Sequence, residues 1–246
     1  MKYEIRKVDE EKGVIQITTS DERWYQLGEK FYPSSTWIAD QYPKGIGFYR
    51  WLADKGWDEA ESIKQTAGDK GSRVHRGVEL LLQGKDLKFD DKVNDEELTP
   101  IEWHCLMTFK EWYDEVKPKI IAIEKSAVNP EIGFGGTIDF ICEIKGEIWI
   151  IDFKTSASIW RSHELQVSSY KRLLPFIEET SGLNIKHVKT AILQLGYIRN
   201  KTKQFKFTEI EDKFELFMHA KAIWEEEITQ KNPPQREYPL TIQLTK

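Results

Sequence analysis

The sequence predicts an α/β fold, and three observations support this prediction. Residues 135 to 154 read GGTIDFICEIKGEIWIIDFK, in which two apolar runs flank Lys145-Gly146, as in an antiparallel β-hairpin with a tight turn. The segment from Ile120 to Val128, IIAIEKSAV, reads as a further strand. Apolar side chains recur at helical spacing elsewhere, for example from Pro100 to Val116. Strands and amphipathic helices are therefore both expected in one globular chain.

The other elements follow from capping and breaking residues. A weak alternation between Tyr3 and Tyr25 around Lys12-Gly13 indicates a small N-terminal hairpin. Ser34 or Ser35 can cap a short helix that carries Trp37 and ends near Pro43. In the first half of the chain we also expect a helix from Phe48 to Trp57, a helix from Gly71-Ser72 to Gly84 and a charged loop from Lys85 to Glu97. In the second half we expect a helix from about His163 to Leu174, a hairpin of Val188–Tyr197 and Gln204–Ile210 around RNKTK, a helix from Phe214 to Ile228 and an extended tail from Pro233. The last of these helices should turn Phe214, Phe217 and Trp224 inward.

Composition limits the class of protein. The chain has 246 residues, nine tryptophans and a formal net charge of −5, which excludes a wholly basic nucleic-acid binder but not a local basic groove. Cys105 and Cys142 are the only cysteines, too few for a four-cysteine zinc or iron–sulfur site. They favour a reducing compartment. Without a membrane-spanning run or a leader peptide in the sequence, we expect a cytoplasmic protein.

The hairpin carries a candidate metal site. If Lys145-Gly146 forms a two-residue turn, Ile144 faces Glu147, and Asp139 falls opposite Asp152 with Cβ atoms about 5 Å apart. Lys154 lies two residues beyond Asp152 and points to the same face. Opposed carboxylates repel unless a cation lies between them, and a divalent metal satisfies this. The alternative is an amphipathic hairpin with both aspartates in solvent, and a slip of one residue would also separate them.

Further candidates come from the flanking elements. His75 lies at the edge of an apolar helical stripe, where a packed core histidine is the alternative to a ligand. Glu124 lies inside an apolar strand, as a third acid near the metal or as the partner of a lysine. Gln166 and Tyr170 are four residues apart on one helical face that can overlie the site, or are simply a surface residue and a packed tyrosine. The aromatic residues near the N-terminus either pack in the core or stack on nucleic-acid bases.

The ordered set of these motifs resembles the PD-(D/E)XK nuclease superfamily, in particular its RecB-like branch. GGTID is similar to the glycine–aspartate motif of that superfamily, IDFKT to its D-x-K motif, QVSSY to its Q-x-x-x-Y motif and GSRVHRGVE to its upstream histidine motif. The chain is most similar to the mitochondrial genome maintenance exonuclease family, over EKSAV, GGTID, WIIDFKTS, LQVSSY and PSSTWIADQYPKG, from about Pro33 to Leu174. Relatives that carry an iron–sulfur cluster have four cysteines, so this chain departs from them.

The resemblance implies a restriction-endonuclease-like core, in which a central mixed sheet with the hairpin in its middle is flanked by helices on both faces. It implies one domain over 1–246, with 1–70 as a DNA-binding elaboration, 71–200 as the catalytic core and 201–246 as a C-terminal hairpin strand and helix. His75, Asp139, Asp152 and the carbonyl of Phe153 would bind one or two Mg²⁺ or Mn²⁺ ions, without an iron–sulfur cluster. Lys154, Gln166, Tyr170 and Glu124 would complete the catalytic set.

The activity implied is a metal-dependent DNA exonuclease that prefers single-stranded ends and acts in DNA repair, recombination or replication. The basic residues expected to contact the DNA backbone, unless they are only solvated, are Arg73, Arg76, Arg161, Lys171 and Arg172. Three alternatives stay open: an endonuclease of restriction or branched-structure type, a catalytically silent nucleic-acid-binding module, and an unrelated carboxylate–metal phosphohydrolase that acts on nucleotides.

Overall fold

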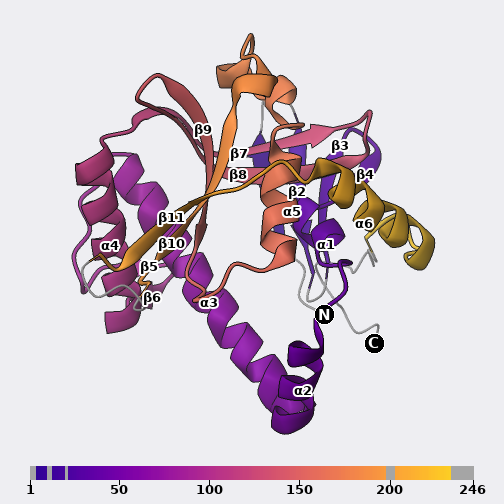
Figure 1. Cartoon of the computed structure of the whole chain (residues 1–246), viewed down its shortest axis with the longest axis horizontal. Helices are drawn as coiled ribbons and strands as arrows, with labels where there is room; N and C mark the ends of the chain where they lie inside the picture. Colours follow the sequence, from indigo (N-terminus) through magenta and orange to yellow (C-terminus); the bar gives the residue numbers. More distant parts are fainter. Residues whose placement is uncertain (1–3, 10–12, 20–21, 198–202, 234–246) are drawn as a thin grey trace, which may run out of the picture.

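The fold was analysed in a computed structural model, which describes residues 4–9, 13–19, 22–197 and 203–233 (Figure 1). Its strands are β1 (Glu4–Asp9), β2 (Val14–Thr18), β3 (Arg23–Leu27), β4 (Lys30–Pro33), β5 (Lys92–Val93), β6 (Glu96–Glu97), β7 (Lys119–Asn129), β8 (Phe134–Ile144), β9 (Glu147–Lys154), β10 (Lys189–Leu195) and β11 (Phe205–Glu209). Its α-helices are α1 (Ser35–Ala39), α2 (Ile46–Lys55), α3 (Trp57–Leu82), α4 (Pro100–Val116), α5 (Arg161–Tyr170) and α6 (Phe214–Glu227), and three short 3₁₀ helices cover Leu174–Phe176, Glu178–Thr180 and Ile185–His187.

A five-stranded mixed sheet forms the centre of the molecule, in the order β11-β10-β9-β8-β7. β9 and β10 are parallel, and every other neighbouring pair in this sheet is antiparallel. The hairpin of β8 and β9 is confirmed, with the expected pairing of Ile144 with Glu147. Lys145 (φ 53°) and Gly146 (φ 83°) both take the left-handed conformation that a two-residue hairpin turn requires.

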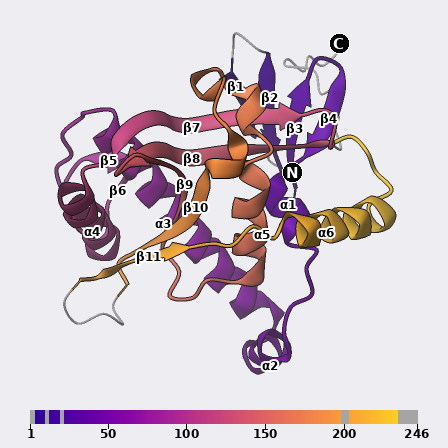
Figure 2. The same cartoon turned by 45° about the horizontal axis from the view of Figure 1, so that its top comes forward.

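Helices cover both faces of this sheet, so the chain is a mixed α/β protein (Figures 1 and 2). On one face, α3 and α4 enclose a core with Val78, Phe109 and Trp112 against Phe140 and Phe153. On the other face, α1, α5 and α6 pack around a core that includes Ile38, Leu165 and Phe217, together with Ile150. Among the described residues, no helix is both long enough and apolar enough to cross a bilayer.

A second sheet of four antiparallel strands, β1 to β4, packs beside the β7 and β8 ends of the central sheet (Figure 2). The expected N-terminal hairpin is β1 with β2, although Lys12 of its turn lies outside the described residues. The sequence reading missed β3 and β4. Close backbone approach explains the glycine pair on β8: a Cβ at Gly135 would lie 2.6 Å from the Tyr25 ring, and one at Gly136 2.9 Å from Leu173.

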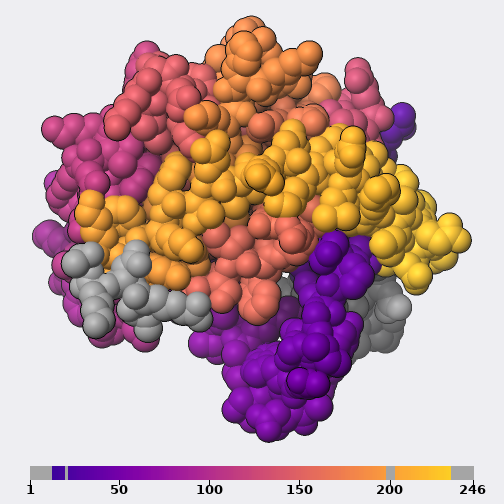
Figure 3. All heavy atoms as spheres, in the orientation of Figure 1, coloured from indigo at the N-terminus to yellow at the C-terminus, as the bar shows by residue number. Residues whose placement is uncertain are grey.

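The expected helix break before residue 71 is wrong. α3 runs without interruption from Trp57 to Leu82, and the Ser72 hydroxyl donates to the carbonyl of Gly68 one turn earlier instead of capping a new helix. The boundary placed between residues 70 and 71 therefore falls inside one helix. With α2, the N-terminal half of α3 projects from the body of the molecule (Figure 3). The other end is as expected, because Gly84 (φ 78°) follows the last helical turn.

The remaining elements largely agree with the sequence. α1 has Ser34 as its N-cap, and α4 covers the predicted range from a Thr99 capping box. Met107 was expected to pack on the sheet, but it is 56% exposed because it lies outside the buried stripe of α4.

The end of α5 differs from the expectation, while the hairpin after it agrees. α5 ends at Tyr170 rather than Leu174, since Pro175 disfavours α-helical geometry in the residue before it and the chain tightens into a 3₁₀ turn. The β10–β11 hairpin is confirmed, while residues 198–202 of its turn and the tail from 234 onward lie outside the described residues.

Candidate active site

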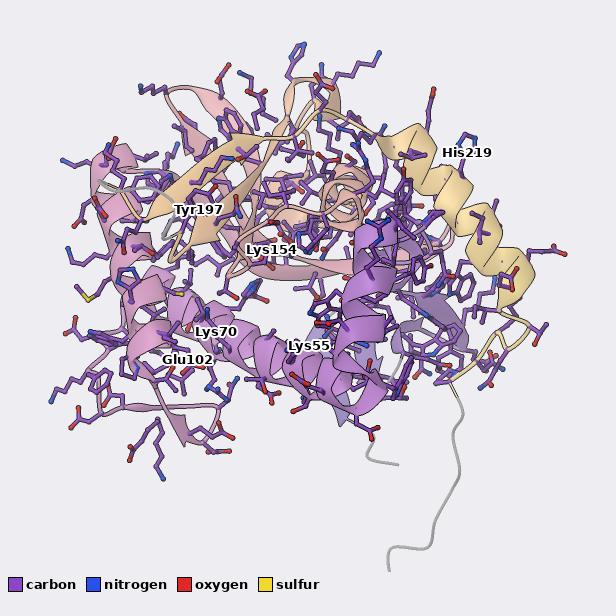
Figure 4. All side chains as sticks on the ribbon, turned by 60° about the horizontal axis from the view of Figure 1, so that its bottom comes forward. Lys55, Lys70, Glu102, Lys154, Tyr197 and His219 are labelled. Carbon is purple, nitrogen blue, oxygen red and sulfur yellow. The ribbon has the colours of Figure 1, made fainter. Side chains whose placement is uncertain are left out.

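An open cleft of about 950 Å³ brings together residues from distant parts of the chain. It lies between α3, the ends of β8 and β9, the start of α5, and the face of the N-terminal sheet. Figure 4 shows Lys154 beside this opening, across from the labelled Lys70 on α3 and Lys55 at the end of α2. The predicted site residues that line it are His75, Glu124, Asp139, Asp152, Lys154, Gln166 and Tyr170.

Asp139 and Asp152 occupy adjacent central strands at the floor of the cleft. The register of β8 and β9 runs to Phe140 opposite Ile151, and one further step places Asp139 opposite Asp152. Both side chains are buried, at 7% and 1% exposure, which rules out the amphipathic hairpin with solvent-facing aspartates. One face of the sheet therefore holds two inward carboxylates at the same level.

Asp139 is held by a histidine and a backbone amide. Its Oδ2 atom accepts a hydrogen bond from the Phe153 N–H at 2.8 Å and lies 3.4 Å from His75 Nδ1. Burial opposes ionisation of Asp139, but His75, Lys154 and the amide outweigh it and lower its pKa. Burial also opposes a charge on His75, yet Asp139 raises its pKa to about 9. His75 Nε2 lies 2.8 Å from the carbonyl oxygen of Phe153.

The pKa of Asp152 is shifted in the opposite direction to that of Asp139. Burial, the largest influence, raises its pKa to about 6 against the attraction of Lys154, and Asp139 raises it further. Lys154 Nζ lies 2.6 Å from Asp152 Oδ2. Neither carboxylate oxygen, however, accepts a hydrogen bond of acceptable geometry within the described chain. Lys154 therefore compensates the charge of Asp152 as an ion pair, while the two carboxylate oxygens keep lone pairs free of geometrically good hydrogen bonds in the described residues.

Glu124 joins this site from β7. Its φ angle is 49°, a left-handed conformation that is rare for a non-glycine residue and unusual inside a strand. The register resumes on both sides of it, with Ile123 opposite Phe140 and Lys125 opposite Ile138. Ligand atoms of Glu124, His75 and Asp139 all lie within 4.8 Å of one another. Glu124 is therefore close enough to His75 and Asp139 to share a cation with them.

Lys154 is linked to α5 through two polar side chains. Its Nζ atom donates to Gln166 Oε1 at 3.4 Å, and Gln166 Nε2 donates to the Tyr170 hydroxyl at 2.6 Å. Tyr170 is 2% exposed, and burial keeps its pKa well above the ordinary value. The pair therefore faces the site, as helical spacing predicted.

The donor set fits a hard divalent cation. His75, Glu124 and Asp139 form the tight group, and Asp152 adds oxygens without hydrogen bonds beside them. Asp152 does not belong to the group of three residues whose ligand atoms lie within 4.8 Å of one another. The carbonyl oxygen of Phe153, which was also expected to bind the metal, lies 2.8 Å from His75 Nε2. The spacing of the three ligand atoms would allow a metal ion, and it does not identify which one.

The five residues expected to contact DNA either form ion pairs within the protein or lie outside the cleft. Arg73 and Arg76 line the cleft, but Arg73 pairs with the buried Glu102 at 2.7 Å and with Glu96, and Arg76 pairs with Glu79 at 2.6 Å. The other three are not among the lining residues of the cleft: Arg161 pairs with Glu164, Arg172 with Asp212, and Lys171 lines a separate hollow.

The sequence reading missed two cleft residues of note. His163 lies one turn before Gln166 on α5, so helical spacing could have found it; burial and then Lys154 lower its pKa to about 3. Arg23 lines the cleft from β3, and no local pattern places it there because it comes from the separate sheet.

No protein-family model matches the chain, and no curated protein matches its sequence at a significant level. The residues of the site therefore carry the functional argument.

Proposed function

We propose that this chain is a divalent-metal-dependent deoxyribonuclease that removes nucleotides from single-stranded DNA ends. We also propose that its five-stranded sheet and flanking helices form a restriction-endonuclease-like core of the RecB-like type. The preference for single-stranded ends comes from the sequence resemblance alone. The metal-dependent hydrolysis of phosphodiesters has support from the site itself.

The observation that carries the proposal is the convergence of His75, Glu124, Asp139, Asp152 and Lys154 on one open cleft. These groups come from α3, β7, β8 and β9, so folding alone brings them together. Three carboxylates, one imidazole and one ammonium in a cleft are the parts that hydrolysis of a phosphodiester at a metal requires. A binding module has no use for two buried carboxylates on opposed positions of one hairpin.

The protein side chains would share the work as follows. Glu124, Asp139, His75 and Asp152 would hold the cation. A bound Mg²⁺ or Mn²⁺ would supply positive charge that polarises a phosphodiester oxygen and acidifies a water molecule. Lys154 would orient the attacking water or stabilise negative charge at phosphorus, since its ammonium lies between Asp152 and Gln166.

Gln166 and Tyr170 would keep Lys154 in place. The Tyr170 hydroxyl accepts from the Gln166 amide nitrogen, which fixes the amide oxygen toward the lysine. This chain of hydrogen bonds spans one turn of α5 and packs on the sheet. Lys154 is thus restrained from two sides, by Asp152 and by Gln166.

The charge of the cleft indicates that cations are needed for binding as well as chemistry. Among the described residues, eight carboxylates line it against four Lys and Arg side chains. A polyanion approaches such a surface only when cations offset the acids. We therefore expect EDTA to weaken DNA binding in addition to stopping cleavage.

The test uses labelled single-stranded DNA, a duplex and a closed circle, each with Mg²⁺, Mn²⁺ or EDTA. Wild type is compared with Asp152→Asn and Lys154→Ala. Asp114→Asn is the matched control, because it removes a carboxylate from α4 outside the cleft. We expect metal-dependent loss of the linear single strand by wild type and the control, with neither site variant active.

Other outcomes would replace the proposal. Cutting of the closed circle would make the protein an endonuclease, and turnover of mononucleotides would make it a nucleotide phosphohydrolase. DNA binding without cleavage in any metal would leave a silent binding module.

A further inference from the structure

We propose that Arg23, on the N-terminal sheet, binds a phosphate of the substrate backbone other than the one that reacts. This inference rests on the proposed function and adds to it a positioning residue that the sequence motifs do not contain. Two observations support it: the arginines of the cleft differ in whether they pair with carboxylates, and Tyr25 joins the N-terminal sheet to the central sheet.

Arg23 differs from the other arginines of the cleft in its pairing. Arg73 and Arg76 each point to carboxylates at ion-pair distance, so their charge is already compensated. Arg23 also lines the cleft, is exposed, and has no carboxylate at ion-pair distance in the described part of the chain. Its guanidinium is therefore available for a bidentate contact with a phosphate.

The surface around Arg23 is suited to the same ligand. Arg23 pairs with Thr18 across β2 and β3, and Tyr25 pairs with Gln16, so these four side chains share one face. All four line the cleft. Gln16 Nε2 donates to the Thr18 hydroxyl at 3.2 Å, which leaves the hydroxyl hydrogen of Thr18 for a phosphate oxygen.

The position of Arg23 relative to the catalytic strand is fixed by Tyr25. The Tyr25 ring lies directly over Gly135, and its hydroxyl is hydrogen-bonded to Thr137 Oγ1 at 2.8 Å. Thr137 is two residues before Asp139 on β8. Arg23 is two residues before Tyr25 on β3, so it lies to one side of the acidic group rather than within it. A strand bound at the metal would pass this wall, where a second phosphate can meet the guanidinium.

The experiment measures steady-state cleavage of a labelled single-stranded oligonucleotide in Mn²⁺ at several salt concentrations. The variants are Arg23→Gln and Arg23→Lys, with Lys119→Gln as a control of equal charge change outside the cleft. We expect Arg23→Gln to raise KM about tenfold with kcat within about twofold, as for the loss of one phosphate contact. The slope of log(kcat/KM) against log salt should weaken by about 0.7. Arg23→Lys should keep the slope, and the control should match wild type.

Each other result overturns the inference. If Arg23→Gln has the KM and salt slope of wild type, Arg23 is not a phosphate contact while the nuclease proposal stands. A fall in kcat at unchanged KM, or a loss of thermal stability, would make Arg23 a catalytic or structural group instead. If wild type cleaves no DNA at all, the proposed function has failed and this inference fails with it.

Discussion

Replacing the Asp152 carboxylate with an amide should make the metal-free protein more stable while abolishing its activity. Asp152 is 1% exposed and its oxygens lack hydrogen bonds in the described chain. Burial raises its pKa from 3.8 to about 6. Because one pH unit corresponds to 1.36 kcal/mol, keeping this group ionised in the folded state costs up to about 3 kcal/mol.

The direction of the pH dependence of stability follows from proton linkage. At Asp152 the folded state holds the proton more tightly than the unfolded state between about pH 4 and 6, so the contribution of Asp152 to the free energy of unfolding falls as pH rises through this window. Above about pH 6 Asp152 is ionised in the folded state, and the full cost in folding free energy applies. This cost is already net of the attraction of Lys154, which lies 2.6 Å away, and asparagine removes it but brings an NH₂ group that needs an acceptor in the buried site. We therefore expect a net gain of about 1–2 kcal/mol near neutral pH, or about 2–8 °C in Tm.

Thermal unfolding of wild type and Asp152→Asn, each in EDTA and in Mn²⁺, measures this effect. Mn²⁺ at a hundred times its Kd should stabilise wild type by about 2.7 kcal/mol, and the variant by less. The advantage of the variant in EDTA should vanish near pH 4, where wild type is protonated. The reasoning is refuted if Asp152→Asn is the less stable protein in EDTA, or if its advantage does not depend on pH. Asp114→Asn should show neither effect.

Three further predictions concern the walls of the site. Gly68→Ala should raise the free energy of unfolding by about 0.5–1 kcal/mol, since a Cβ at this position meets nothing within 4 Å. Gly77→Ala should lower the free energy of unfolding, because its Cβ would lie 2.8 Å from the side chain of a buried leucine. Urea titration of both variants measures these changes. Because burial lowers the pKa of His163 to about 3, the contribution of His163 to the free energy of unfolding should fall as pH drops below about 6.5, and the difference between wild type and His163→Gln in urea titrations from about pH 5 to 7 measures that contribution. Tyr170→Phe leaves the Gln166 amide without its acceptor, which should cost about 1 kcal/mol in unfolding and lower kcat with KM unchanged.

The parts of the site that the sequence predicted are those fixed by local geometry. A two-residue turn sets the register of the hairpin, so the spacing of Asp139 and Asp152 from Lys145-Gly146 was sufficient to place them opposite each other. The four-residue separation of Gln166 and Tyr170 was sufficient to put them on one helical face. Neither prediction needed knowledge of the rest of the fold.

The parts that could not be predicted depend on contacts between distant elements. Arg23 reaches the cleft only because the Tyr25 ring packs on Gly135, more than a hundred residues later. The left-handed conformation of Glu124 has no marker in the sequence, since glycine or asparagine would be expected there. α3 was divided too early because Gly71-Ser72 resembles a helix start, whereas packing of Val74 and Val78 under α4 continues the helix.

Three departures from local rules lie at the cleft. Glu124 has a backbone conformation that costs about 1–3 kcal/mol, Asp152 is a buried acid whose pKa is raised to about 6, and Gly68 lies inside the continuous helix α3 although a Cβ there would have room. All three line the same cleft. Each of the three lowers the stability of the folded chain, and departures of this kind are commonly found at functional sites, so their common location supports the cleft as the candidate site.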